Sequence, residues 1–453
     1  MAEKTETRNK RRMQWAWYLY DFGNSAYAAV VLLAVYATYF KNVVVGGPEG
    51  SALWGLALMI ATLVVAIISP FLGTLADYSS KKKQFLFFMT TLSVVFTALL
   101  FLVKQGDILM GMVFFILAEI GYRGGQVFYN ALLIDIADED ELGKVSGNGW
   151  AIGSFGGIIC LLIVLVLIQL NPGDTTIVRF SLVITAVYYA LFALPTFFII
   201  KEKPSTEQKI HKNYFKIAWE RLSKTIKSVS NYKEFLKYML ALLIYNDGII
   251  AALDFAAIIG AVLFGIAGTD LIIFVIIVQV TNVAGAYVYG LIGEKVGYKN
   301  SLIQSLILMI IAVTGMIFIN SELAFFIVGG LAGFAMAGVQ SLSRTMVSIF
   351  APKNKSTEFY GFFALTGRSS SVIGPGVMGF SASGISAWVM NTLVAAGLVM
   401  AGDELAITVT EQIGHRFALV TILLFLLIGL MLLLFVDEKK GRIAARNGDA
   451  DMS

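Results

Sequence analysis

The sequence predicts an all-α integral membrane protein with twelve transmembrane helices in two pseudo-symmetric halves of six. The first observation behind this prediction is composition: 58% of the 453 residues are hydrophobic, 14% are charged, and the mean hydropathy is +0.79. A soluble protein of this length carries nearer to about 25% charged residues. The second observation is a series of twelve apolar runs, and the third is a set of polar patterns that occur once in each half.

The twelve apolar runs are each about as long as the roughly 20 helical residues that cross a bilayer. In the first half they are predicted at 18–40, 53–75, 85–103, 109–134, 146–170 and 177–200. In the second half they are predicted at 235–264, 271–292, 301–319, 323–350, 360–381 and 416–435. The chain thus divides into a first half at 1–200, a linker at 201–234 and a second half at 235–453.

Lysine and arginine residues are distributed unevenly between the two sides of these spans. With the N-terminus on the cytoplasmic side, 27 of the 34 fall in cytoplasmic segments. Four fall on the opposite side: Lys41, Lys104, Arg179 and Arg416. Because cytoplasmic loops carry an excess of basic residues, we expect a multi-pass protein of the plasma (inner) membrane with both termini in the cytoplasm.

Two segments leave alternatives open. The basic linker at 201–234 has apolar residues every two to four positions, so it is either a cytoplasmic amphipathic helix on anionic lipid or a solvated linker, and we favour the helix. The second half also contains an extra segment at about 385–414. Its apolar part, 385–401, is a thirteenth span, a continuation of span 11 or a helix on the outer surface. We favour the surface helix because the run is short for a span.

Residue types argue against several other functions. The only cysteine, Cys160, lies in an apolar run, so no internal disulfide can form. The two histidines, His211 and His415, are far apart in sequence and have no cysteine partners, which argues against zinc. We find no hydrolase, metalloprotease or nucleotide-phosphate motif and no sizeable soluble domain. We therefore expect neither an enzyme nor an ATP-driven pump, no metal or other cofactor, and no nucleic-acid partner.

Polar residues mark the first span of each half. The first half opens on Tyr20-Asp-Phe-Gly23 and the second on Tyr245-Asn-Asp-Gly248, so an aspartate lies between the tyrosine and the glycine both times. A carboxylate in a spanning helix is costly and usually faces a polar cavity or a partner. This repeat indicates that each half begins with a polar-marked helix.

The polar residues of the first span share helix faces. Asp21 and Asn24 are three residues apart, and Tyr20, Asn24 and Tyr27 follow at helical spacing. We interpret this face as lining the solute cavity. The alternative is that Asp21 lies at the cytoplasmic headgroup level, where it caps or pairs locally.

The fourth span carries an ionisable pair, Glu119 and Arg123, at i and i+4, and Gln126 and Asn130 continue the same face. Ionisable residues in the middle of a span are usually functional. The alternative is a buried ion pair that only positions helices. Our hypothesis is that Glu119 takes a proton when Arg123 turns to the solute.

The seventh span carries Asp247 and Asp254, seven residues apart and well inside the apolar run. They are candidates to bind a solute amine or a proton. The alternative is pairing with an arginine elsewhere, such as Arg344 in span 10 or Arg368 in span 11.

Two cytoplasmic turns carry the same motif, a glycine and an acidic residue four positions apart followed by a basic cluster. The motif residues are Gly73 and Asp77 between spans 2 and 3, and Gly290 and Glu294 between spans 8 and 9. The glycines should allow close helix approach, and the acids could latch one helix end to another. Such a latch suits a protein with two conformations.

A second repeat relates span 4 to span 10 at a constant offset of 214 residues. Gly124 matches Gly338, and Gln126 matches Gln340, while Asn130 falls opposite Arg344. We include Gln340 and Arg344 among the residues expected to line the cavity. Duplicated six-span halves are typical of one large class of secondary transporters, in which solute binds near the middle of the membrane.

These motifs resemble a known family. The paired loops look like the signature of the major facilitator superfamily, and Arg123 with Gln126 is similar to its span-4 arginine motif. The opening Tyr-Asp-Phe-Gly-Asn-Ser-Ala-Tyr resembles the branch related to the fungal vacuolar amino-acid effluxers of autophagy. Tyr78 and Ser80 depart from the usual loop motif, and the start of span 5 lacks the proline of antiporter members.

The resemblance implies a secondary active transporter that exports amino acids by alternating access. The residues alone indicate a small polar solute, with acids and arginines that could hold an amine and a carboxylate. The alternative is a proton-coupled transporter of a sugar, nucleoside or organic cation. We expect a small-molecule solute, a coupling proton and membrane lipids as partners, and a monomer as the oligomeric state.

Overall fold

The computed structural model describes residues 2–79, 81–137, 142–202, 223, 232–352, 356–400 and 402–450. Within these residues the secondary structure is helical, and twelve helices are long and apolar enough to cross a membrane. The prediction of an all-α protein with twelve transmembrane helices is therefore confirmed. Nearly all of the linker at 201–234 lies outside the described residues, and so does its predicted amphipathic helix.

The chain forms two compact units, the first made of 1–46 with 60–218 and the second of 47–59 with 219–453. In the first unit, span 1 is α1 (Ala2–Tyr27), which continues through η1 (Ala28–Ala34), α2 (Tyr36–Tyr39) and η2 (Phe40–Val45). The rest of this unit consists of the later part of α3 (Glu49–Ser79), α4 (Lys82–Leu99), η3 (Leu100–Leu102), α5 (Ile108–Ala131), α6 (Leu133–Ile136), α7 (Leu142–Leu170) and α8 (Thr175–Ile199).

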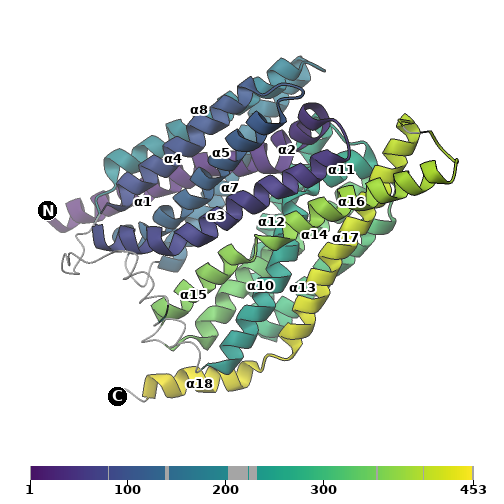
Figure 1. The fold of residues 1–453 in the computed structure, drawn as a ribbon. Helices are drawn as coiled ribbons and strands as arrows, with labels where there is room; N and C mark the ends of the chain where they lie inside the picture. The colour runs from purple at the N-terminus through teal and green to yellow at the C-terminus, as the bar shows by residue number, and fades with distance from the viewer. Residues whose placement is uncertain are drawn as a thin grey trace. The chain divides into compact units, whose positions relative to one another are not determined.

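The second unit begins with the first part of α3. Its other helices are α10 (Lys233–Asp254), α11 (Ala256–Phe264), α12 (Thr269–Val296), α13 (Tyr298–Phe318), α14 (Glu322–Phe350), α15 (Ser356–Ser369), α16 (Ile373–Ala395), α17 (Glu404–Leu434) and α18 (Glu438–Ala450). Figure 1 shows α18 turning away from the axis of α17 at the end of this unit.

Gly23 and Gly248, which the sequence pairs in the two halves, make equivalent contacts. A Cβ on Gly23 would lie 2.9 Å from the Cβ of Phe192 in α8. A Cβ on Gly248 would lie 2.9 Å from the Cβ of Phe425 in α17. In each unit the first transmembrane helix therefore packs closely on the sixth, because a glycine at the contact removes the side chain that would separate them.

Two spans that the sequence predicts as continuous are interrupted. Span 7 changes from α10 to α11 at Phe255. Span 11 changes from α15 to α16 within residues 370–372. A break frees backbone N–H and C=O groups that must find other partners in an apolar setting. Breaks of this kind form binding sites in other transporters.

The extra segment near 385–414 belongs to two long helices. α16 continues to Ala395, α17 begins at Glu404, and the two pack side by side up to their joined ends (Figure 1). Residues 385–395 thus continue span 11, and our preference for a separate surface helix is wrong. The extension is stable because α17 packs along it: a Cβ on Gly414 would lie only 3.1 Å from the Cβ of Ser386.

The first part of α3 packs against α16 and α17 within the second unit, although its sequence belongs to the first half. A Cβ on Gly55 would overlap the carbonyl oxygen of Pro375. Ser51 Oγ lies 2.8 Å from His415 Nε2, and His415 Nδ1 lies 2.9 Å from the carbonyl oxygen of Glu411. Because a carbonyl only accepts, Nδ1 carries the proton and Ser51 donates to Nε2. His415 thus joins helices and has a structural role here.

Candidate functional site

The first unit contains the predicted ion pair of span 4. Glu119 and Arg123 are one turn apart on α5, and the Arg123 Nε donates to Glu119 Oε1. The Glu119 side chain is fully buried, whereas that of Arg123 is 21% exposed. The second carboxylate oxygen, Glu119 Oε2, is buried and has no hydrogen-bond partner among the residues that the structure describes. The pair therefore has one spare acceptor inside the unit and one cation that reaches its surface.

Tyr27 on α1 faces this pair. Its ring is fully buried and stacks on Tyr122 of α5, with ring centroids 4.7 Å apart. The Tyr27 hydroxyl faces the Glu119 carboxylate, which is its hydrogen-bond partner. Asn24 Oδ1 on α1 is also buried and has no hydrogen-bond partner in the described part of the chain. A buried polar atom left unpaired costs about 1–3 kcal/mol, so water, a proton or a solute is the expected partner of Asn24 Oδ1 and of Glu119 Oε2.

Tyr20 fixes α1 to the helices around it. Its hydroxyl lies 2.8 Å from Thr90 Oγ1 on α4 and 2.8 Å from the Tyr189 hydroxyl on α8. Its ring stacks on Tyr129, which also stacks on Trp17 with centroids 4.3 Å apart. Sequence reasoning missed Thr90 and Tyr189, because an isolated threonine or tyrosine in an apolar run carries no signal of its own.

The structure does not bring all the predicted residues of this unit together. Asp21 points toward α7, where a Cβ on Gly153 would overlap Asp21 Oδ2. Tyr27 faces α5 instead, so the face that we predicted from Asp21, Asn24 and Tyr27 is divided between two neighbouring helices. Gln126 is half-buried and Asn130 is exposed.

In the second unit, Asp247 lies at the break in span 11. Its Oδ1 accepts a hydrogen bond of 2.7 Å from the backbone N–H of Gly374 in the first turn of α16. The side chain is buried, with 4% of the residue exposed. An anionic group at a helix N-terminus is stabilised by the free N–H groups and the helix dipole. Asp247 thus binds the start of α16 through a backbone group. The arginine partner that we considered as an alternative stays a prediction, because the Arg368 side chain lies outside the described part of the molecule.

Asn246, beside Asp247, is the centre of a side-chain network. Its Nδ2 donates to Ser370 Oγ at 2.6 Å, and its Oδ1 accepts from Gln340 Nε2 at 3.0 Å. Ser370 in turn donates to the Gly367 carbonyl at 2.9 Å. The network joins α10, α14 and the break in span 11. We predicted Gln340 but not Asn246 or Ser370, although three serines followed by Gly-Pro inside an apolar run indicate such a break.

The remaining candidates of this unit have different surroundings. Asp254 is buried at the end of α10, and its carbonyl accepts from Trp54 Nε1 at 3.0 Å. Arg344 is exposed on α14, whereas its neighbour Ser343 is buried and binds the Tyr245 hydroxyl at 2.7 Å. Arg368 belongs to α15, but its side chain lies outside the described part of the molecule.

The structure describes only some residues of the two loop motifs. Gly73 and Asp77 lie in α3 and Glu294 in α12, in stretches whose side chains the structure does not describe. A Cβ on Gly290 would meet no heavy atom of a neighbouring described helix within 4 Å, so the close helix approach expected there stays a prediction. The approach occurs one turn later, at Gly293, where a Cβ would lie 2.8 Å from the Tyr298 ring.

Comparison with known proteins places these features in a family. Residues 52–383 match the family model described as "Vacuole effluxer Atg22 like". The uncharacterized MFS-type transporter YxiO of Bacillus subtilis is 30% identical over 80% of this chain and 86% of its own length. Autophagy-related protein 22 of Yarrowia lipolytica is 22% identical over 71% of this chain, which spans 55% of that relative.

A solved structure shares the fold. The crystal structure of a bacterial homologue of the human lysosomal transporter Spinster, inward-facing and unoccupied, matches with a TM-score of 0.65. The match covers 97% of both chains at 14% sequence identity. At this identity the likeness shows the fold alone.

Proposed function

The chain belongs to the family of Atg22-like vacuole effluxers and is an MFS-type transporter, and we propose that it exports amino acids by alternating access, coupled to protons. What we propose beyond the family is the class of solute, the direction of transport and the coupling to protons. The observation that supports them best is the buried Glu119–Arg123 pair with its spare carboxylate oxygen.

The pair has the chemistry for an exchange between proton and solute. A guanidinium presents a planar set of donors that matches a carboxylate in two places, so Arg123 suits the carboxylate of an amino acid. When Arg123 turns to the solute, Glu119 loses its cation inside an apolar unit. A buried carboxylate without a partner takes up a proton. Solute binding at Arg123 would then be linked to protonation of Glu119.

The second unit carries hydrogen-bonding groups of another kind. The network of Asn246, Gln340 and Ser370 carries neutral amides and a hydroxyl. Neutral groups of this kind bind polar parts of a solute without adding a charge that must be balanced. The Asp247 carboxylate is engaged by α16 in this conformation. We propose that it holds the broken helix in place rather than binding the solute amine here.

We also propose the plasma (inner) membrane as the location, with both termini in the cytoplasm and lipids around a monomer. The distribution of Lys and Arg supports this orientation.

Counterflow tests the solute and the coupling. Purified protein is reconstituted in proteoliposomes loaded with one amino acid at a time, at two pH values. We expect the native protein to exchange a subset of amino acids. Arg123→Ala should lower the exchange rate about tenfold or more, because a charged hydrogen bond is removed. Glu119→Gln should exchange without the pH dependence, and Glu322→Gln, at an exposed site on α14, is the control.

The outcomes separate the parts of the proposal. If correctly inserted protein exchanges no amino acid, the solute assignment fails, and sugars, nucleosides and organic cations form the next panel. If Glu119→Gln keeps its full pH dependence, the coupling role of Glu119 fails even where amino acids are exchanged.

A further inference from the structure

A cavity of about 200 Å³ lies at the end of the second unit where α10 begins and α14 ends. Its lining, in the part of the chain that the structure describes, comes from the start of α10, the end of α14 and the first two turns of α18. A helix rises about 1.5 Å per residue, so Asn246 lies about 16 Å further along α10 than Phe235, which lines the cavity. The cavity is therefore separate from the polar network of this unit.

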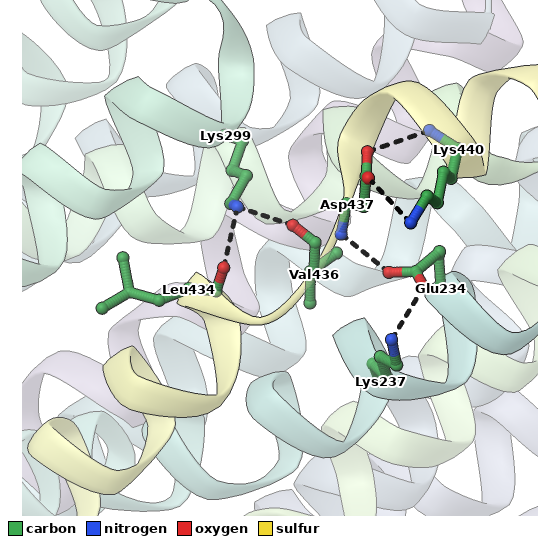
Figure 2. A network of polar contacts seen from close by, with 7 residues as sticks. All are labelled: Glu234, Lys237, Lys299, Leu434, Val436, Asp437 and Lys440. Carbon is green, nitrogen blue, oxygen red and sulfur yellow. Dashed lines mark hydrogen bonds and ion pairs between the residues drawn. The ribbon is translucent and has the colours of Figure 1, made fainter.

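The position of α18 gives the cavity its third wall. Gly441 of α18 lies against Phe350 of α14, where a Cβ would overlap the phenyl ring. Figure 2 shows the contacts that hold the turn leading into α18. Lys299 of α13 donates to two carbonyl oxygens where α17 ends, at 2.6 and 3.2 Å, and Glu234 of α10 accepts from the backbone N–H of Asp437 at 2.7 Å. The start of α18 is therefore fixed beside α10 and α14.

One side of the cavity is apolar and rigid. Phe235 and Phe350 line it, and each is 1% exposed. Phe235 packs on Phe359 with ring centroids 4.4 Å apart, and Phe350 packs on Tyr238 with ring centroids 5.7 Å apart. Because these neighbours hold both rings in place, the wall is already formed before a ligand arrives. Apolar surface that leaves water is stabilised by about 25 cal/mol per Å², so this side favours an apolar body.

The rim of the cavity carries an excess of positive charge. Lys233 at the start of α10 and Lys440 on α18 are both exposed. Lys440 Nζ lies 3.5 Å from Asp437 Oδ2 with 75% of the side chain exposed, and a surface pair of this kind contributes little, so the ammonium group can turn to a ligand. Glu234 is the acidic residue of the described lining, and its two oxygens already accept from Lys237 Nζ at 2.8 Å and from the Asp437 N–H. The cavity therefore attracts an anion.

We propose that this cavity binds a small organic anion, which has an apolar body of one ring or a short chain and one anionic group. The body packs on Phe235 and Phe350, and the anionic group accepts charge-assisted hydrogen bonds from Lys233 and Lys440. A volume of about 200 Å³ is below the roughly 300–1,000 Å³ of pockets that hold drug-sized ligands, so the ligand is smaller than these. Bound there, it joins α10 to α18. The inference goes beyond the proposed function and does not depend on which solute is moved.

Phenyl phosphate is the probe, because it combines one ring with one anionic group. Isothermal titration calorimetry of the full-length protein in an uncharged detergent should show saturable binding, and amide hydrogen exchange should slow in the first turns of α10 and α18. Lys440→Met and Lys233→Met should each weaken binding about tenfold, because each removes a charge-assisted hydrogen bond. Lys439→Met is the matched control: this lysine is exposed on α18 but outside the described lining, and the affinity of this variant should stay within about twofold of the native protein.

One further variant and one further ligand test the apolar wall. Ala444 also lines the cavity, so Ala444→Leu should remove binding while the melting temperature stays close to that of the native protein. Inorganic phosphate, which lacks the ring, should bind about tenfold more weakly than phenyl phosphate. Equal affinities in Lys440→Met and Lys439→Met, or no saturable binding of phenyl phosphate to folded protein, would overturn the proposal.

An anionic lipid headgroup carries the same chemistry, and the choice of lipid distinguishes it from a dissolved anion. Phenyl phosphate is titrated into the native protein and Lys440→Met in nanodiscs of phosphatidylcholine and of phosphatidylglycerol. A loss of affinity in phosphatidylglycerol that is larger for the native protein than for Lys440→Met identifies a lipid headgroup as the occupant. The same loss in both proteins identifies a dissolved anion. These measurements need no transported solute, so their failure is distinct from failure of the proposed function.

Discussion

Asp247 accepts a hydrogen bond of 2.7 Å from the backbone N–H of Gly374, 127 residues further along the chain. The contact joins the first transmembrane helix of the second unit to the start of α16. A Cβ on Gly374 would lie 2.5 Å from the Asp247 carbonyl oxygen, so the two backbones are almost in contact. The Asp247 carboxylate and the close approach at Gly374 therefore hold the break in span 11, together with the Asn246–Ser370 hydrogen bond.

Removing the Asp247 charge should loosen the start of α16. Asp247→Ala loses both the hydrogen bond and the interaction with the helix N-terminus, and we expect a loss of about 1–2 kcal/mol in unfolding free energy. Asp247→Asn keeps an acceptor and should lose less. Thermal unfolding and amide exchange at Gly374 measure the effect. Equal stability of the alanine variant and the native protein would contradict a capping role.

The Asn246 network should behave as one unit. Asn246→Leu leaves Gln340 and Ser370 without their buried partner, and we expect a cost of about 1–3 kcal/mol. Gln340→Leu added to Asn246→Leu should cost less than the sum of the two single changes, because the contact is already lost. A double-mutant cycle in thermal unfolding gives the coupling. Strict additivity would show that the hydrogen bond contributes nothing.

Glycines at helix contacts should not tolerate alanine. A Cβ on Gly156 of α7 would overlap the Phe22 carbonyl oxygen of α1, a backbone atom that cannot turn aside. Gly156→Ala should cost about 1–3 kcal/mol. Gly384→Ala is the matched control, because a Cβ there would meet no atom of a neighbouring described helix within 4 Å and alanine is the better helix former. The melting temperature should fall in Gly156→Ala and should stay the same or rise in Gly384→Ala.

Cysteine labelling tests the orientation. The only native cysteine, Cys160, is buried, so single cysteines at the surface report cleanly after Cys160→Ala. Lys104→Cys should react with a membrane-impermeant maleimide added to intact cells. Lys439→Cys should react only after the membrane is opened. Both residues are exposed in the structure. The reverse pattern would place both termini on the outer side.

The stability of the first turn of α18 should depend on pH through Asp437, which Figure 2 shows beside Lys440. The backbone N–H of Lys440 donates to its Oδ1 at 3.0 Å and holds the pKa of this carboxyl below its usual value of 3.8. A depressed pKa in the folded state means that the contact stabilises the helix start above 3.8 and is lost as the pH falls through the lower folded value. Amide exchange at Lys440, corrected for its intrinsic rate, should stay constant from neutral pH to about pH 5. Asp437→Asn should abolish the loss of protection at lower pH.

Features that follow from local composition were predictable. Twelve helices can be read from run length and hydropathy, because crossing a bilayer requires about 20 apolar residues wherever they occur. The pairing of Glu119 with Arg123 follows from their four-residue spacing on one helix. Gly23 and Gly248 could be matched because each follows a tyrosine and an aspartate in the opening span of its half.

Features that depend on contacts between distant parts of the chain could not be predicted. Asp21 and Tyr27 lie on one helix, yet one contacts α7 and the other α5, and spacing cannot tell which neighbour each will meet. Gly290 and Gly293 look equally suitable for a close contact in the sequence, but among the described residues only the second has a neighbour there. The continuation of α16 to Ala395 depends on α17 packing along it.

The membrane class, the number of spans, the two related halves and the residues with unusual chemistry in apolar surroundings all follow from the order of residues along the chain. The breaks in spans 7 and 11 and the partner of Asp247 are visible only in the folded chain. The physical reason is that hydropathy and helical spacing are properties of consecutive residues. A hydrogen-bond partner 127 residues away is chosen by how the helices pack.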